Sequence, residues 1–407
     1  MHFPKLERRP ELDALRGIFL AWMIFVHLPT RFSDLAAQPF GFVSAAEGFV
    51  LLSALLVARI YSREHSVDAG GVRRHLWRRS LKIYGYHLAL IAFTFTVVAA
   101  YAVHVHRLAL MNLLDFYLAH PVAGAVGALF LLYCPPLLDI LPMYILFLFL
   151  SPVVLSLARR VKWGTVMAAS LALWAAAQFG LKEAFEHALN QVTHLQIPVH
   201  ESGAFDLFAW QAVWVTGLWL GSESARGEVP LNRVPRWAIP VSGVLCVFFF
   251  LCRFGWLGPH LNWPALGLLV DKWQLGPLRV VNLVAFAIFF WWLRKWVVLL
   301  IHREPFLTMG KASLQVFCAH LFFVFAGLAL LYGDMTQLGW GTAIVLTTAT
   351  FVALFFVALR EVGRKRAKKA GTLGEPDAAL EPAGRARELT REPARVPVKS
   401  EAADLVR

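Results

Sequence analysis

Long apolar runs recur along this chain, and most of them are separated only by short polar segments. A helix needs roughly 20 apolar residues to cross the hydrocarbon core of a bilayer. Ten runs come close to that length, at residues 14–31, 41–60, 80–103, 137–157, 163–180, 205–222, 237–254, 278–301, 313–332 and 340–360. Only 16% of the residues are charged, against about 25% in a soluble domain. The sequence therefore predicts an all-α polytopic membrane protein with about ten transmembrane helices, and excludes a soluble enzyme, a disordered chain and a disulfide scaffold.

The positions of the positive charges predict which loops face the cytoplasm, where Lys and Arg accumulate. The region between the second and third runs is strongly basic and contains only two acidic residues. Its basic residues are Arg59, Arg63, Arg73, Arg74, Arg78, Arg79 and Lys82. Counting spans from that region, the RKRAKK segment at 364–369 also falls inside. Both termini are thus predicted to be cytoplasmic, and the net charge of +13 requires no nucleic acid partner.

Two segments lie outside the predicted spans. Residues 107–136 are apolar but are interrupted by Pro135 and Pro136, which indicates a helix at the outer surface or a partly inserted hairpin. Residues 361–407 are rich in Glu, Arg, Pro and Ala, which predicts a disordered cytoplasmic tail whose basic start contacts anionic lipid. The membrane domain is accordingly expected to cover residues 1–360.

Ionisable residues inside apolar runs are costly and are therefore candidates for function. Arg16 and His27 are eleven residues apart, close to three helical turns, so they share one face and are separated by roughly 16 Å along the axis. Arg16 is either an interfacial anchor paired with Asp13 or an anion-binding residue. His27 and Glu47 are either hydrogen-bonded packing residues or functional groups near the middle of the bilayer.

A histidine and a carboxylate that meet within the membrane favour two kinds of chemistry. The histidine can act as a general base with the carboxylate supporting its cation, or the pair can relay protons in a transporter. The cytoplasmic cluster of Arg74, Arg78 and Arg79 is either topogenic charge or a site for the phosphates of a donor such as coenzyme A.

A polar segment between the first two runs departs from the positive-inside pattern, since it carries Arg31 on the predicted outer side. That arginine is either an interfacial anchor or a contact for an anionic acyl tail or a sugar hydroxyl. The neighbouring candidates for such contacts are Ser33, Asp34 and Gln38.

Four motifs resemble the signatures of the acyltransferase-3 superfamily, and they follow one another along this chain in the order that the superfamily has. They are DALRG followed by His27, GFVSAAEGFVLLSALL in the second run, LWRRSLKIY at 76–84, and GKAS at 310–313 leading to His320. Ala54 stands where the superfamily usually has glycine. The positions that carry the match are Asp13, Arg16, Gly17, His27, Glu47, Ser53, Ser313 and His320.

Within that superfamily, segments 27–50, 137–147 and 275–279 resemble the OpgC-type branch, whose members succinylate osmoregulated periplasmic glucans in the bacterial inner membrane. The resemblance implies His27 as the catalytic base, Glu47 as its partner, and Arg16 with the arginine cluster as the donor site. It also implies succinyl-coenzyme A as a co-substrate, a periplasmic glucan as the acceptor, membrane lipids as neighbours, and no permanent cofactor or metal. A transporter or flippase that uses the same histidine and acid as a proton relay is the competing expectation.

Overall fold

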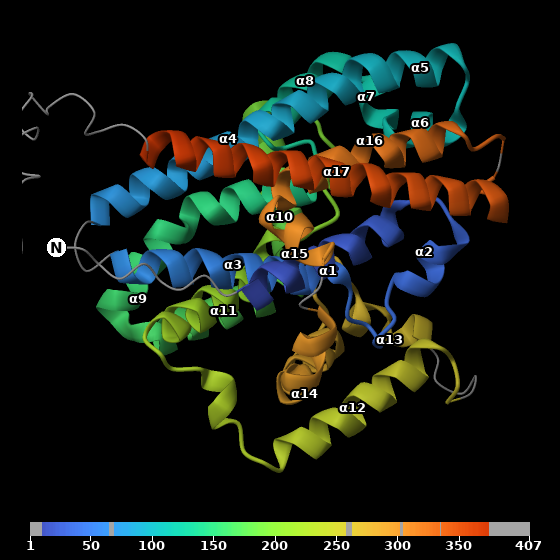
Figure 1. The fold of residues 1–407 in the computed structure, drawn as a ribbon. Helices are drawn as coiled ribbons and strands as arrows, with labels where there is room; N and C mark the ends of the chain where they lie inside the picture. Colours follow the sequence, from blue (N-terminus) through green and yellow to red (C-terminus); the bar gives the residue numbers. More distant parts are fainter. Residues whose placement is uncertain (1–9, 65–68, 258–262, 302–303, 334, 374–407) are drawn as a thin grey trace, which may run out of the picture. The chain divides into compact units, whose positions relative to one another are not determined.

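The computed structural model describes residues 10–64, 69–257, 263–301, 304–333 and 335–373. It divides into one compact unit over residues 1–362 and a second unit over residues 363–407. The described residues are helical with connecting loops, and they contain no β-strand (Figure 1). The all-α class predicted from the sequence is therefore confirmed.

The helices follow one another with short connections. Their bounds are α1 Pro10–His27, α2 Arg31–Ala36, α3 Ala45–Glu64, α4 Ala69–Phe93, α5 Ala99–His104, α6 Leu108–Leu113, α7 Asp115–Ala119, α8 Pro121–Leu129, α9 Ile140–Ala177, α10 Leu181–Thr193, α11 Leu207–Ala225, α12 Ala238–Arg253, α13 Trp263–Val270, α14 Pro277–Ile301, α15 Phe306–Lys311, α16 Ser313–Ala329 and α17 Trp340–Leu373. A π-helical turn, Thr94–Val98, joins α4 to α5, and 3₁₀ turns cover Val199–Glu201 and Pro230–Arg233.

Each of the ten predicted runs falls on a helix, and four helical stretches are long and apolar enough to cross a membrane. These stretches are Gly70–His104, Ile140–Ala177, Pro277–Arg294 and Trp340–Lys368. Such a set indicates a multi-pass membrane protein. The helices α1, α3 and α11 pack mainly against one another and against other helices of the bundle.

The fourth and fifth runs form the two halves of α9, which are separated by a break at Lys162 (φ 68°, ψ 158°). The Ser151 hydroxyl accepts a hydrogen bond from Trp214 Nε1 at 3.0 Å, and Ser170 bonds Gln211 at 2.7 Å. Because Trp214 and Gln211 lie within one turn of α11, the two halves of α9 must run back alongside each other. The reversal predicted between residues 157 and 163 is thus present in the fold.

The structure agrees with the prediction for one of the two segments outside the predicted spans and differs from it for the other. Residues 107–136 form three short helices, of which the longest, α8, has nine residues, so none can cross a bilayer. The segment predicted to be disordered from residue 361 is helical as far as residue 373, because α17 continues that far through a sequence rich in the helix formers Arg, Lys and Ala. Residues 374–407 lie outside the described part of the chain.

Small residues let two pairs of helices approach closely. In α11, Gly217 and Gly221 lie against Ala54 and Ala58 of α3, which is the small-residue packing that joins helices in membranes. A methyl group at position 54 is therefore accommodated by a glycine on the facing helix. The residue that replaces the usual glycine of the motif thus lies at a helix–helix contact.

The second close approach joins α1 to α15. A Cβ atom on Gly17 would overlap the carbonyl oxygen of Phe306, and a Cβ atom on Gly310 would overlap the carbonyl oxygen of Asp13. These neighbours are backbone atoms that cannot rotate away. The two glycines therefore set the distance between α1 and the start of the α15–α16 segment.

We expect the Gly310→Ala variant to be less stable than wild type by about 1–3 kcal/mol, because overpacking forces backbones apart. The measurement is thermal unfolding of the detergent-solubilised protein. Gly85→Ala in α4 is the matched control, since a Cβ there has no neighbouring heavy atom within 4 Å and alanine favours a helix. Equal melting temperatures for the two variants would contradict the close α1–α15 contact.

Candidate active site

Two histidines meet where α1 ends and α16 passes beside it. His27 Nδ1 lies 2.9 Å from His320 Nε2, and the two rings stack with centroids 5.2 Å apart and an interplanar angle of 22°. His320 is fully buried, whereas His27 is partly exposed. The two residues belong to separate sequence motifs, and the fold brings them into direct contact.

The hydrogen bonds of the pair determine which nitrogen atoms carry protons. His320 Nδ1 lies within hydrogen-bond distance of the Phe317 carbonyl oxygen, and a carbonyl can only accept. A neutral His320 therefore donates from Nδ1 and accepts at Nε2. The donor to that nitrogen is His27 Nδ1–H, which leaves a lone pair on His27 Nε2. Among the described residues His27 makes no other hydrogen bond, so that lone pair is available to a ligand.

Three of the sequence motifs meet at Arg16, about three turns before His27 on α1. The Arg16 guanidinium donates to the Ser313 hydroxyl at the start of α16. It also lies over the Phe49 ring of α3, 5.9 Å from the centroid. The first, second and late motifs are therefore parts of one structural core, and α1 and α16 are joined at both Arg16–Ser313 and His27–His320.

Glu47 has a different partner from the predicted one. Its Oε1 accepts from Arg279 Nε at 2.5 Å, and its Oε2 accepts from the Ser44 backbone N–H at 3.0 Å. Ser44 directly precedes α3, so Ser44 and Glu47 have the spacing of a capping box, which holds the carboxylate at the helix start. Glu47 and Arg279 are both fully buried.

Both the catalytic hypothesis and the proton-relay hypothesis expected a contact between Glu47 and His27. The structure instead pairs Glu47 with Arg279 and His27 with His320. The buried guanidinium of Arg279 requires a counter-ion, and Glu47 supplies it. His27 is oriented by His320. Glu47 and His320 both belong to sequence motifs, but the sequence predicts neither of these partners.

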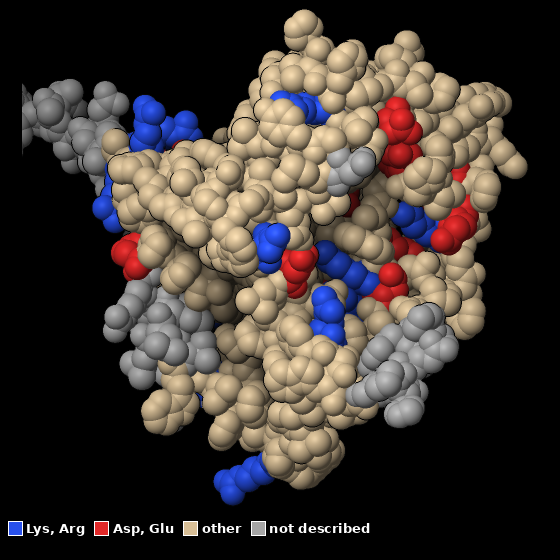
Figure 2. All heavy atoms as spheres, turned by 90° about the vertical axis from the view of Figure 1, so that its right-hand side faces the viewer, with Lys and Arg blue, Asp and Glu red and all other residues tan. Residues whose placement is uncertain are grey.

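A small, partly open cavity lies beside His27. Its lining comes from α1, from Ser44 and the start of α3, and from the first residue of α9 with the loop before it. The loops before α11 and α14 complete the lining. The lining residues are Met23, Val26, His27, Ser44, Ala45, Ala46, Leu137, Asp139, Ile140, Phe205 and Lys272. Figure 2 looks at the side of the molecule where Figure 1 shows α2 and α13. Acidic and basic side chains gather there around a recess near the centre, and most of the remaining surface is uncharged.

Two charged residues of the cavity, Asp139 and Lys272, were absent from the sequence predictions. Asp139 Oδ2 accepts from the Ala204 backbone N–H at 3.2 Å. Burial lowers the pKa of Lys272, while the negative charge of Glu47 acts in the opposite direction. Asp139 lies within segment 137–147, and Lys272 lies three residues before segment 275–279. Both segments carry the family resemblance, and that proximity was the available signal.

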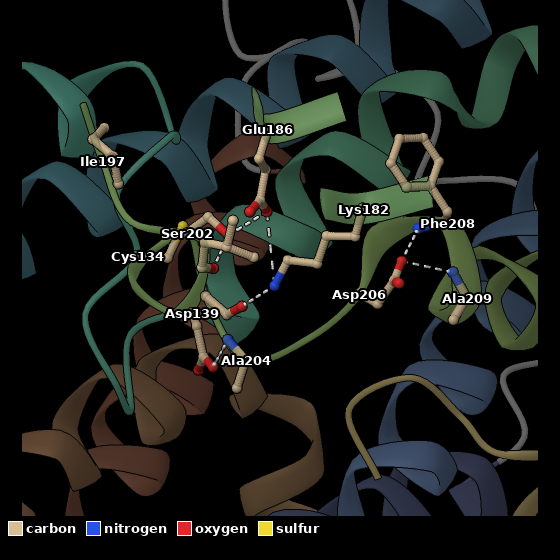
Figure 3. A network of polar contacts seen from close by, with 12 residues as sticks. Cys134, Asp139, Lys182, Glu186, Ile197, Ser202, Ala204, Asp206, Phe208 and Ala209 are labelled. Carbon is tan, nitrogen blue, oxygen red and sulfur yellow. Dashed lines mark hydrogen bonds and ion pairs between the residues drawn. The ribbon is translucent and has the colours of Figure 1, made fainter. Parts of the chain in front are cut away.

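A polar network next to the cavity holds the loop that contributes Phe205 (Figure 3). Lys182 of α10 donates to the Gly203 carbonyl oxygen at 2.6 Å and lies 3.7 Å from Glu186. Glu186 in turn accepts from the Ser202 hydroxyl. The loop continues to Asp206, which caps α11 by accepting from the backbone N–H groups of Phe208 and Ala209. These contacts fix one wall of the cavity.

The predicted donor arginines lie in the first turns of α4, which Figure 1 shows at the opposite side from α2. Arg74 and Arg78 are exposed. Arg79 is partly buried and contacts the Tyr144 hydroxyl at 3.4 Å. The structure therefore does not bring this cluster together with His27, and Arg16 lies about three turns of α1 before His27.

The predicted acceptor contacts around α2 do not line the cavity. The Arg31 guanidinium lies 5.5 Å from the Trp340 ring centroid, and Asp34 accepts from Gln337 Nε2 at 2.5 Å. Ser33 bonds the Thr30 carbonyl oxygen at 2.7 Å, and Gln38 is partly exposed. Arg31 and Asp34 thus join α2 to the start of α17 and to the connection that precedes it.

Two further signature residues occupy buried positions in the bundle. Asp13 is 7% exposed, and its carbonyl oxygen is the group against which Gly310 packs. Ser53 is 1% exposed, and its hydroxyl has no hydrogen-bond partner among the described residues. Neither residue lines the cavity.

No curated protein and no solved structure matches this chain. A family model matches residues 8–366, a range that begins before α1 and ends within α17, and its description is OpgC protein.

Proposed function

Because this chain belongs to the OpgC protein family, we propose that it is a membrane O-succinyltransferase. It moves the succinyl group of cytoplasmic succinyl-coenzyme A to glucose hydroxyls of a periplasmic glucan, in the bacterial inner membrane. The observation that carries the proposal is the His27–His320 pair, which presents a free ring nitrogen of His27 to a cavity.

His27 acts as the general base in this proposal. Its Nε2 takes the proton of a glucose hydroxyl while the hydroxyl oxygen bonds to the thioester carbonyl carbon. The carbon–sulfur bond then breaks, and coenzyme A leaves as a thiolate that receives the proton from His27. The products are a succinyl ester on the glucan and free coenzyme A, so the histidine ends in its starting state.

His320 is the positioning residue of the same step. By accepting from His27 Nδ1–H, it keeps the lone pair on Nε2 and holds the ring toward the cavity, which is the role that a carboxylate has in a Ser-His-Asp triad. A neutral acceptor stabilises the His27 cation less than a carboxylate would. The base therefore returns its proton readily to the leaving thiolate.

The donor enters from the opposite side of the bundle. Arg74, Arg78 and Arg79 offer guanidinium groups for its phosphates, and the pantetheine arm reaches toward His27 past Arg16. The rise of roughly 16 Å between Arg16 and His27 is about half the thickness of the hydrocarbon core. A long, thin donor suits that distance.

The proposal is tested with the purified protein in lipid vesicles, given labelled succinyl-coenzyme A and unmodified glucan. We expect labelled ester on the glucan and release of one free thiol for each ester formed. Movement of glucan across the vesicle wall without any ester would identify a transporter instead. If succinyl-coenzyme A and glucan are both present and the protein forms no ester and moves no glucan, the transferase proposal is refuted.

A further inference from the structure

Lys272 places a positive charge in the same cavity as His27. It lies in the loop between α13 and α14, and both residues line the cavity. Its Nζ atom is 4.5 Å from the Trp273 ring centroid and 6.0 Å from that of Phe205. The side chain is therefore held between aromatic rings and the cavity instead of extending into open solvent.

No carboxylate of the described residues forms an ion pair with Lys272. Glu47 and Asp139 are near enough for their charges to act on it, but each has other partners. Glu47 binds Arg279 and Ser44, and Asp139 accepts from the Ala204 backbone. A largely buried ammonium group without a close counter-ion is unfavourable, and an anion that enters the cavity would compensate it.

The loop that carries Lys272 is anchored on three sides. Trp210 Nε1 lies 3.3 Å from the Lys272 carbonyl oxygen and 3.0 Å from that of Trp273. Trp174 Nε1 donates to the Leu275 carbonyl oxygen at 2.9 Å, and Gln178 Nε2 donates to that of Gln274 at 2.8 Å. These bonds from α9 and α11 preorganise the position of the ammonium group.

We propose that Lys272 binds the free carboxylate of the succinyl group and so selects a dicarboxylic acyl donor. This inference rests on the proposed function. A general base serves succinyl and uncharged acyl groups equally, so His27 cannot distinguish them. An ammonium group beside it can, because only the dicarboxylic donor brings a negative charge that makes charge-assisted hydrogen bonds.

The test compares succinyl-coenzyme A with butyryl-coenzyme A, which has the same number of acyl carbons but no free carboxylate. In wild type we expect a higher kcat/KM for the succinyl donor. In Lys272→Met that ratio should fall by about tenfold to a hundredfold, the usual range for a hydrogen bond to a charged group. Transfer of butyryl should persist, and Lys272→Arg should keep most of the preference.

The controls separate this proposal from its alternatives. Arg253→Met removes an exposed positive charge at the end of α12 and should leave the donor preference unchanged. If kcat/KM fell equally for the succinyl and butyryl donors in both Lys272→Met and the milder Lys272→Gln, the proposal would be overturned. Lys272 would then contact the thioester oxygen or support the fold. An unchanged succinyl preference would also overturn the proposal. Wild type that transfers neither acyl group would instead refute the proposed function itself.

Discussion

The His27→Ala variant should lose succinyl transfer by about 10²–10⁴-fold, the usual contribution of a positioned general base, while its amount in the membrane stays near wild type. The expectation follows from the free Nε2 at the cavity and from the partial exposure of His27, whose ring forms no ion pair among the described residues. The measurement is the succinyl content of the periplasmic glucan, together with the quantity of protein in the membrane fraction. Acylation at the wild-type level in this variant would refute the assignment of His27 as the base.

His320 variants distinguish a positioning role from a purely structural one. His320→Gln keeps an acceptor for His27 Nδ1–H, whereas His320→Leu removes it. We expect kcat to fall further in His320→Leu than in His320→Gln, with little change in KM for either substrate, because binding groups remain in place. Equal losses of kcat in the two variants, or losses that follow protein level, would contradict the positioning role.

The Glu47→Gln variant should lose about 3–5 kcal/mol of stability, the usual result of removing one member of a buried ion pair. Arg279 is fully buried and would keep its charge without a counter-ion. The measurement is thermal unfolding of the purified protein. The family resemblance implies Glu47 as a catalytic partner, but its contacts with Arg279 and Ser44 favour this effect on the fold.

Two comparisons make this prediction specific. The double variant Glu47→Leu with Arg279→Met removes both charges and should recover most of the lost stability. Glu223→Gln breaks an exposed pair with Arg226 and should cost no more than about 1 kcal/mol. A Glu47→Gln protein with a normal melting temperature and no transfer activity would restore Glu47 to the reaction.

Much of the helical architecture could be predicted from hydrophobicity alone. The ten apolar runs correspond to helices, and the reversal within α9 appears where the charged residues Arg159, Arg160 and Lys162 interrupt two runs. The extension of α17 beyond residue 360 was missed because low hydrophobicity was interpreted as disorder. Arginine, lysine and alanine favour a helix without needing a buried face.

The site was predicted only in part. Arg16 and His27 could be placed on one helix face because helical spacing is regular. The partners of His27 and Glu47 lie 293 and 232 residues away in the chain, and no local pattern carries that information. One local signal was overlooked, since Ser44 and Glu47 have the spacing of a capping box, which indicates that the acid is bound to its own helix start.

By itself, the sequence determined that this chain is a helical membrane protein of the OpgC type with ionisable residues in its first two apolar runs. Hydrophobicity and helical period are local properties, so they can be read residue by residue. Only the tertiary structure decided that His320 orients His27, that Arg279 neutralises Glu47, and that Lys272 reaches the same cavity. Those contacts depend on which helix faces pack together, and packing depends on the shapes of all the helices at once.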